Sequence, residues 1–230
     1  GSEMCIRDRF VSDASHELKT PLAGIRLLTD SILQTDHMDE ETTKEFVTDI
    51  GREAERLSRI TENLLRLTRL DSGVVQQPYP VAVRPVLERV ERMLTMVAQE
   101  KGVTVSGAAD EDAVALATDD DVHQILYNLM ENAIKYSAAE GGFVRAEAHV
   151  DGDKVVLTVS DNGIGIPNED LPHIFDRFYR VDKSRSKATG GTGLGLAIVK
   201  HIALIHEARI KLESQVDVGT TITVTFPTAS

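Results

Sequence analysis

The chain has 230 residues, with 25 Lys or Arg against 37 Asp or Glu, which gives a net charge of −12. This negative balance argues against a general nucleic-acid binder and against docking on anionic lipid, because both need a basic face. The single cysteine, Cys5, excludes an internal disulfide framework, and no apolar run reaches the roughly 18 residues that span a bilayer. Hydrophobic residues make up 41% of the chain, so one large or two small domains can bury a core.

Residues 1–9 do not share the pattern that begins at Phe10, and we expect them to be a linker or an artefact outside the fold. From Phe10 the apolar residues recur at steps of three and four, which predicts one amphipathic helix. Pro21 should kink this helix, because proline removes a backbone donor. The apolar stripe comprises Phe10, Ala14, Leu18, Leu22, Ile25, Leu28 and Ile32.

A second helix is predicted after a polar turn, with Asp39 as its N-cap. Its apolar stripe runs from Phe46 to Leu67, and its other face carries charged residues such as Arg56, as on a solvated surface. Residues 10–73 therefore form a helical hairpin, which cannot bury both stripes by itself. A dimeric four-helix bundle solves that problem. On periodicity alone, a generic coiled-coil stalk is an equally good interpretation.

Residues 74–80 include two prolines and are expected to link the hairpin to a second domain at residues 81–230. That domain mixes helical segments with strands of period-two alternation, which predicts a two-layer α/β sandwich. Asp119 or Asp120 is expected to cap its second helix. The expected helices span 83–100, 119–136 and 193–206, and the expected strands span 103–105, 113–117, 144–150, 155–159, 209–213 and 220–226.

One histidine in the first helix carries candidate chemistry. His16 is followed by Glu17, and Thr20-Pro21 completes a His-Glu-x-x-Thr-Pro box that is unexpected in a plain stalk. Because the apolar stripe faces the bundle core, His16 should point outward, where another domain can reach it. A neutral imidazole has one nitrogen lone pair free for attack, and Glu17 can accept the proton from the other ring nitrogen.

A polar stripe on a later helix indicates a phosphate site. Asn128, Asn132 and Lys135 lie at i, i+4 and i+7, so all three project from one side of the helix. Two amide oxygens suit Mg²⁺, which keeps most of its waters and bridges phosphates, and the ammonium of Lys135 suits phosphate charge. A polar stripe that faces solvent is the alternative interpretation.

Two glycine-rich segments complete the candidate site. Asp161 lies on the inward-facing side of a predicted strand end, where a carboxylate needs a donor such as the exocyclic amine of adenine. Gly163 and Gly165, followed by Ile166, let the backbone approach a base closely, although an ordinary turn is the alternative. The second segment opens a helix, whose N-terminal backbone N–H groups attract anions. It comprises Gly191, Thr192, Gly193, Leu194 and Gly195.

These motifs occur in the order found in orthodox bacterial sensor histidine kinases, a family that the chain resembles over residues 10–227. The resemblance implies a dimerisation and histidine phosphotransfer hairpin, followed by an ATP-binding domain with the Bergerat (GHKL) fold shared with gyrase, Hsp90 and MutL. It also implies that His16 is phosphorylated from ATP. The motifs that carry it are the His16 box, the Asn132 box, Asp161-x-Gly163-x-Gly165, Ile174-Phe175-x-x-Phe178 and Gly191-x-Gly193-x-Gly195.

The resemblance implies roles for single residues as well. Asn132, helped by Asn128, would hold Mg²⁺, and Arg180 would reach the γ-phosphate from a lid at residues 168–190. Thr20 would position a water that dephosphorylates the partner protein. The nucleotide-binding set that follows is Asn128, Asn132, Lys135, Tyr136, Asp161, Gly163, Gly165, Ile166, Phe178, Gly191, Thr192, Gly193, Leu194 and Gly195.

The expected partners follow from the same resemblance. They are the receiver domain of a response regulator, which accepts the phosphoryl group on an aspartate, and a second copy of this chain. Relatives carry a sensor region with membrane spans ahead of such a hairpin. The sequence is therefore expected to be the cytoplasmic portion of a bacterial inner-membrane receptor.

Kinase and ATPase readings of the second domain differ at one position. Related ATPases place a water-activating glutamate four residues before the metal asparagine, where this chain has Asn128. Glu131 adjoins Asn132 but lies roughly 100° round the helix, and it should point elsewhere. The site then lacks a base for hydrolysis, which favours His16 as the nucleophile. An ATPase or serine kinase that is dimerised by the hairpin, and a nucleotide-sensing scaffold, remain as alternative hypotheses.

Overall fold

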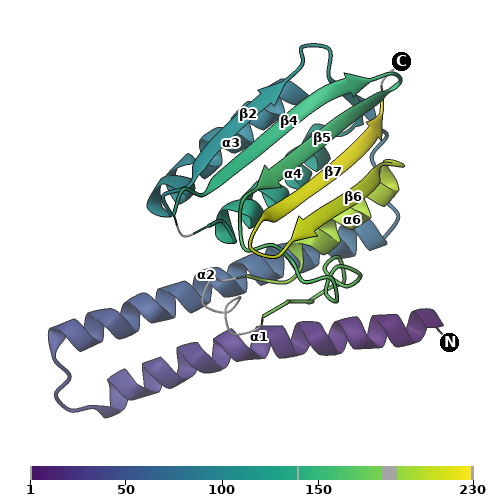
Figure 1. Cartoon of the computed structure of the whole chain (residues 1–230). Helices are drawn as coiled ribbons and strands as arrows, with labels where there is room; N and C mark the ends of the chain where they lie inside the picture. The colour runs from purple at the N-terminus through teal and green to yellow at the C-terminus, as the bar shows by residue number, and fades with distance from the viewer. Residues whose placement is uncertain (1, 139, 183–190, 229–230) are drawn as a thin grey trace.

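The structure is a computed structural model that describes residues 2–138, 140–182 and 191–228. Its N-terminal part is a helical hairpin of α1 (Ser2–Gln34) and α2 (Glu40–Asp71), whose helices pack side by side (Figure 1). The rest of the described chain forms an α/β domain that sits against the hairpin. The predicted division into a hairpin followed by a sandwich is therefore confirmed.

The local sequence explains where α2 begins, but not where α1 begins. Asp39 caps α2 as predicted, since its carboxylate accepts a hydrogen bond from the Thr42 backbone N–H at 2.8 Å. α1 begins at Ser2, earlier than the apolar periodicity from Phe10 predicted, and it continues through Pro21. Periodicity reports only where a helix has an apolar face, so it does not detect a helical extension whose pattern differs.

The α/β domain is the expected two-layer sandwich. A five-stranded sheet has the order β2-β4-β5-β7-β6, in which β2 and β4 run parallel and the other neighbours pair antiparallel. Helices α3, α4 and α6 cover one face of this sheet (Figure 1). The elements are β1 (Tyr79–Ala82), α3 (Val83–Glu100), β2 (Thr104–Ala109), β3 (Val114–Ala117), α4 (Asp119–Lys135), β4 (Phe143–Asp151), β5 (Lys154–Asp161), α6 (Gly195–Ile205), β6 (Arg209–Gln215) and β7 (Gly219–Pro227).

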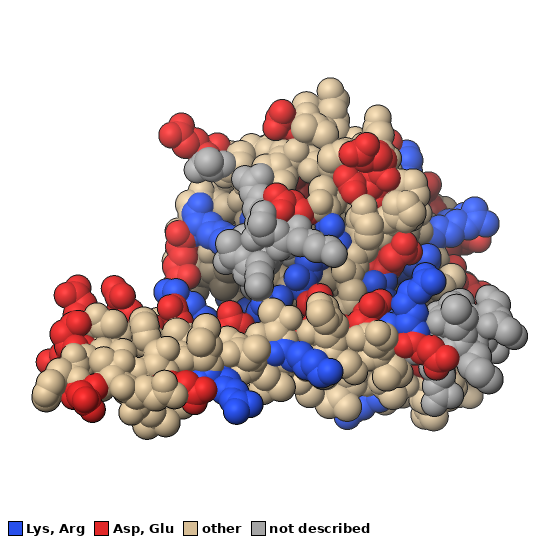
Figure 2. Space-filling model, turned by 90° about the horizontal axis from the view of Figure 1, so that it is seen from below, with Lys and Arg blue, Asp and Glu red and all other residues tan. Residues whose placement is uncertain are grey.

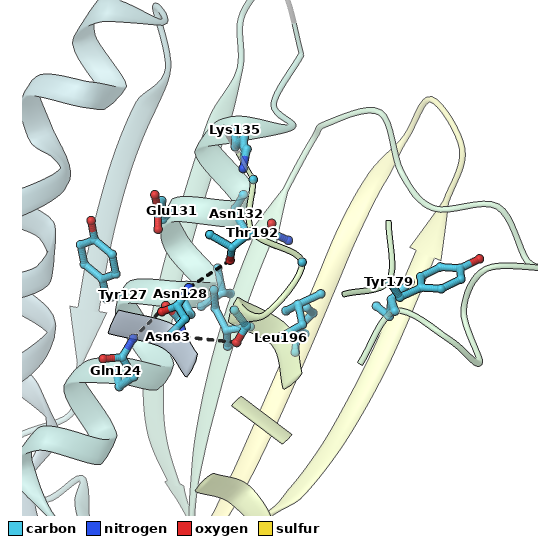
Figure 3. Close-up of a pocket in the computed structure, with 18 of the residues that line it drawn as sticks. Asn63, Gln124, Tyr127, Asn128, Glu131, Asn132, Lys135, Tyr179, Thr192 and Leu196 are labelled. Atoms are coloured by element: carbon cyan, nitrogen blue, oxygen red, sulfur yellow. Dashed lines mark hydrogen bonds between the residues drawn. The ribbon is translucent and has the colours of Figure 1, made fainter. Parts of the chain in front are cut away.

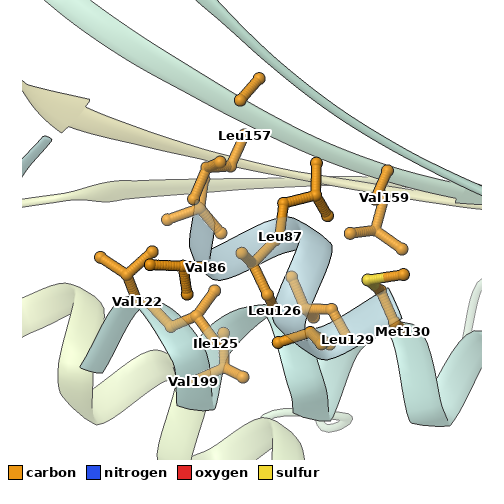
Figure 4. Close-up of a cluster of buried hydrophobic side chains, with 14 of the residues drawn as sticks. Val86, Leu87, Val122, Ile125, Leu126, Leu129, Met130, Leu157, Val159 and Val199 are labelled. Atoms are coloured by element: carbon orange, nitrogen blue, oxygen red, sulfur yellow. The ribbon is translucent and has the colours of Figure 1, made fainter. Parts of the chain in front are cut away.

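The core of this domain fixes α4 against the sheet. Leu157 and Val159 of β5 face Leu126 and Met130 of α4, and all four are buried (Figure 4). Burying an aliphatic side chain of this size stabilises the fold by about 1.5–3 kcal/mol. The apolar side of α4 is thereby held to the core, which leaves its polar stripe to form a wall of the site.

Two local predictions in this domain were wrong. Tyr79 and Pro80, expected in the linker, belong to β1, which pairs antiparallel with β3. The N-cap of α4 is Thr118 rather than Asp119 or Asp120, because the Thr118 hydroxyl accepts the backbone N–H that lies three residues on, at 3.1 Å. A short strand depends on a partner far along the chain. Thr and Asp are both good caps, so composition alone did not separate them.

Within one chain the hairpin leaves apolar side chains uncovered. Leu27 and Leu33 of α1 are 68% and 77% exposed, and Val47 and Leu65 of α2 are also exposed. Seen from below, charged side chains of both signs are scattered along the hairpin with broad areas of other residues between them (Figure 2). No helix in the described residues combines the length and apolar character that membrane crossing requires.

Candidate functional site

The three polar clusters of the α/β domain converge on one cavity of about 1200 Å³ (Figure 3). Its walls are α4, the end of β5 with the loop that follows, the glycine-rich turn before α6, and one side of α2. The predicted residues that line it are Asn128, Asn132, Lys135, Tyr136, Asp161, Gly165, Ile166, Arg180, Gly191, Thr192, Gly193 and Gly195. Segments far apart in the sequence, such as those of Asn128 and Gly195, which are separated by 67 positions, therefore build a single site.

Three predicted nucleotide-site residues support this cavity from behind. Leu194 is fully buried, and the backbone N–H of Phe178 donates to the Gly193 carbonyl at 2.8 Å, which joins the lid segment to the glycine-rich turn. A Cβ on Gly163 would lie 2.1 Å from the Tyr136 carbonyl oxygen, so only glycine fits there. These residues shape the site without forming its surface. Residues 183–190 of the expected lid lie outside the described chain.

Asp161 has the environment of a buried acceptor. Burial raises the pKa of its carboxyl, while hydrogen bonds from the Gly163 and Thr220 backbone N–H groups oppose that change. The Gly163 contact measures 2.8 Å and engages Oδ1. A part-buried carboxylate at a cavity wall suits recognition of a neutral N–H donor, such as the amine of a purine.

The two asparagines of the polar stripe differ in the hydrogen bonds that their side chains make. Asn128 accepts from the Gln124 amide at 2.9 Å and donates to the Gly195 carbonyl at 3.2 Å, which ties α4 to the start of α6 (Figure 3). Asn132 also lines the cavity, and its side chain makes no hydrogen bond within the described part of the chain. The structure thus gives Asn128 a connecting role that the sequence did not predict, and it leaves the Asn132 amide available to a ligand.

Lys135 lies at the same end of the cavity as Tyr136, with its ammonium 5.7 Å from the Tyr136 ring centre. Burial lowers the pKa of Lys135 to about 8; Glu131 opposes this, and the positive charges of Arg59 and Arg180 add to it. Cations from α2, from α4 and from the lid segment therefore share one region. That concentration of positive charge suits a polyphosphate.

The prediction that Glu131 points away from the site was wrong. Glu131 lines the cavity, and its charge acts on both Lys135 and Tyr127 (Figure 3). The reason is that α2 closes the far side of the cavity. A residue 100° round α4 from Asn132 then still faces an enclosed space rather than bulk solvent.

On the hairpin, His16 is exposed, as predicted. The neighbouring Glu17 carboxylate accepts a hydrogen bond from the guanidinium of Arg180 at 2.9 Å, and a nitrogen of Arg56 lies 3.8 Å from the same oxygen. Glu17 therefore faces two arginines here, whereas the imidazole was its expected partner. Arg180 both lines the cavity and touches the residue next to His16, so it connects the two halves of the candidate site.

The hairpin holds the α/β domain through further polar contacts that sequence analysis missed. Asn63 donates to the Thr192 hydroxyl at 3.0 Å, and Arg66 forms ion pairs with Asp120 and Asp121 at 2.9 and 3.0 Å. A further ion pair joins the guanidinium of Arg177 to the carboxylate of Asp71. In Figure 2, basic side chains lie where the hairpin meets the domain. From the charged face of the second helix we predicted only a polar surface. A pattern of charges along one helix does not show which distant residues will pair with it.

Two family models match the chain. Residues 117–230 match the family described as "Histidine kinase-, DNA gyrase B-, and HSP90-like ATPase", and residues 6–73 match "His Kinase A (phospho-acceptor) domain". Together the two matches cover most of the chain and contain every residue predicted for the site. The second match coincides with the hairpin, and the first covers the α/β domain from α4 onward, while β1, α3 and β2 lie ahead of it.

Curated relatives are similar to nearly the whole of this chain. Sensor histidine kinase WalK of Bacillus subtilis is 36% identical over 96% of this chain, which spans 36% of WalK. Sensor-like histidine kinase SenX3 of Mycolicibacterium smegmatis is 35% identical over 96% of this chain, which spans 57% of SenX3. The chain therefore covers less than two thirds of these relatives.

A solved structure supports the fold independently. Histidine kinase ThkA, in complex with response regulator protein TrrA, superposes with a TM-score of 0.78 at 21% identity, over 99% of this chain and 64% of that one. At that identity the likeness concerns the fold alone. With both family models and the relatives pointing the same way, the chain belongs to the sensor histidine kinases of bacterial two-component systems.

Proposed function

We propose that this chain transfers the γ-phosphoryl group of ATP to its own His16 and then passes it to an aspartate of a response regulator. One observation carries the proposal: Arg180 lines the nucleotide-sized cavity and also bonds Glu17 at 2.9 Å, beside an exposed His16. A single side chain, that of Arg180, therefore contacts both the nucleotide cavity and the residue next to the proposed acceptor histidine.

The cavity residues divide the work of holding the nucleotide. Asp161 would accept from the adenine amine, while Lys135, Tyr136 and the glycine-rich turn would contact phosphates. Asn132 fits Mg²⁺, since its amide oxygen is uncommitted, and the described residues hold no group of three or more acidic, His or Cys side chains that would form a separate cage. A Mg²⁺ ion held there would neutralise part of the phosphate charge.

The transfer step uses residues of the hairpin. A ring nitrogen of His16 would attack the γ-phosphorus as the bond to the β-phosphate oxygen breaks, so that ADP leaves. Glu17 would take the proton from the other ring nitrogen, and Arg180 would neutralise charge on the transferred group. In the structure Glu17 and Arg180 are bonded to each other, so both must separate before the step.

The partners are part of the proposal. The exposed apolar side chains of α1 and α2 fit a second hairpin, which gives a homodimeric four-helix bundle. The complex of ThkA with a response regulator supports a receiver domain as the phosphoryl acceptor. A sensor region ahead of the hairpin would place this chain on the cytoplasmic side of an inner membrane, as in a receptor.

Incubation with γ-labelled ATP tests the proposed function. We expect label on the chain that is lost in acid and kept in alkali, as for a phosphorus–nitrogen bond. Label that survives acid, or steady phosphate release with no labelled protein, would contradict the proposal.

Because Glu131 lines the cavity, ATP hydrolysis by the α/β domain is a second candidate function. It predicts phosphate release that Glu131→Gln abolishes.

The pKa of Lys135 predicts a pH-dependent affinity for ATP. Below about pH 8 the ammonium is charged and attracts phosphate, and above it the charge is lost, so affinity should fall by roughly tenfold per pH unit. Lys135→Arg stays charged throughout and should show a flat profile over the same range. Equilibrium binding of a fluorescent ATP analogue between pH 7 and 9.5 measures both. Parallel slopes in the two proteins would contradict the assignment of Lys135 to phosphate.

Thr20→Ala should separate phosphatase from kinase action. The Thr20 hydroxyl donates to the His16 carbonyl at 3.2 Å, one turn along α1, and its lone pairs remain open to a water. We expect autophosphorylation within about twofold of the original rate and regulator dephosphorylation slower by tenfold or more. Thr29→Ala is the matched control, because Thr29 makes the same bond to Ile25 at 2.7 Å. Equal loss of both activities would argue against a water-positioning role.

A further inference from the structure

Arg56 of α2 is a buried side chain that the proposed chemistry leaves unexplained. It was expected on a solvated face, yet it is only 4% exposed. Its contacts are poor for a buried cation: one nitrogen lies 3.8 Å from Glu17 and another 3.9 Å from Glu53, both beyond hydrogen-bond distance. Two of its nitrogens, Nε and one terminal nitrogen, have no hydrogen-bond partner among the described residues.

A buried guanidinium with open donors is costly, so its retention calls for a physical reason. The closer of its two carboxylate contacts is Glu17 Oε2, and that same oxygen already accepts a hydrogen bond from Arg180 at 2.9 Å. Arg180 is itself only 8% exposed at its side chain. Two buried arginines therefore compete for one carboxylate oxygen, and Arg180 holds the shorter contact.

The two arginines belong to different parts of the molecule. Arg56 lies on the helix that packs along α1, so it stays with Glu17 whatever the α/β domain does. Arg180 comes from the lid segment, and the proposed function requires it to leave for the γ-phosphate. When it leaves, Glu17 loses its hydrogen bond at the moment when its carboxylate must be in place beside His16.

We propose that Arg56 is a positioning residue that takes over Glu17 when Arg180 moves to the nucleotide. A shortening of about 1 Å turns the present 3.8 Å contact of Arg56 Nη2 into a charge-assisted hydrogen bond, and the open Nε and Nη1 donors belong to the same guanidinium. The exchange keeps the Glu17 carboxylate held by an arginine, beside His16 in the sequence, throughout transfer. This inference rests on the proposed function, because Glu17 must be held in place only if His16 is the phosphoryl acceptor.

The test compares Arg56→Gln with Arg56→Lys and with Arg52→Gln, an exposed arginine one turn away on α2 that pairs with Asp49. Arg56→Gln should slow label incorporation at saturating ATP by roughly 10- to 100-fold, with ATP affinity within about twofold. Arg56→Lys keeps the charge without the planar fork and should give an intermediate rate. Arg52→Gln should match the original protein in both measurements.

A double-mutant comparison shows whether Arg56 acts through Glu17. If it does, the Glu17→Gln, Arg56→Gln double variant is no slower than Glu17→Gln alone. Additive losses, or an original rate in Arg56→Gln, overturn the inference while leaving the proposed function intact. If Arg56→Gln fails to fold by circular dichroism, Arg56→Lys decides, since a rate and affinity both equal to the original would overturn it. Absence of acid-labile label on the original chain would instead overturn the proposed function, and this inference with it.

Discussion

His16→Gln is expected to incorporate no label from γ-labelled ATP while binding ATP as tightly as the original chain. Glutamine keeps the size and polarity of the side chain but offers no nucleophilic ring nitrogen. The position is exposed on α1, so the substitution should leave hairpin packing unchanged. Filter binding of labelled protein, with ATP affinity measured in parallel, checks both parts of this expectation.

The matched control for this experiment is His37→Gln. His37 is also exposed, and it lies in the turn between α1 and α2, away from the cavity. Its replacement should leave labelling unchanged. Label that persists in His16→Gln would remove the acceptor from the proposal and favour hydrolysis or transfer to another protein. Loss of ATP binding in His16→Gln would show that the substitution disturbs the α/β domain instead.

Asn132→Asp is expected to weaken ATP binding by about 10- to 100-fold in the presence of Mg²⁺. The change replaces a neutral amide by a carboxylate of the same shape at the cavity wall. Its added negative charge would repel the phosphates, and an altered ligand would disturb the geometry around Mg²⁺. Titration with a fluorescent ATP analogue, with and without Mg²⁺, measures the loss.

Gln99→Glu serves as the control for charge alone. It adds the same negative charge on the exposed side of α3, outside the cavity, and should leave ATP affinity unchanged. Undiminished affinity in Asn132→Asp would contradict the assignment of this asparagine to the Mg²⁺–phosphate site. Because Asn128 is already bonded to Gln124 and Gly195, its replacement should instead loosen the junction between α4 and α6.

The predictions that the structure bears out share a local origin. Exposure of His16 followed from the apolar stripe on its own helix, and the Asp39 cap followed from one side chain at a helix start. The stripe of Asn128, Asn132 and Lys135 followed from helical spacing. Each depends on residues a few positions apart, where backbone geometry alone sets which side chains share a face.

Two of the errors have a different origin, which is contact between distant segments. Arg56 was placed on a solvated face because neighbouring residues on α2 are charged, yet Glu17 and Glu53 cover it. Glu131 was predicted to point away from the site because an isolated helix would expose it, yet α2 encloses that side. In both cases the hairpin and the α/β domain supply surfaces that no local pattern contains.

The sequence by itself determined the fold class and the family, and it supplied His16 and the nucleotide-site residues as candidates, because helix periodicity and motif order are properties of short segments. The tertiary structure alone decided that Arg180 bonds Glu17, that Arg56 is buried beside them, and that Asn63, Arg66 and Asp71 hold the α/β domain to the hairpin. Those pairings join residues separated by 39 to 163 positions. Their distances depend on how two separately folded surfaces meet, which is set by packing rather than by local propensity.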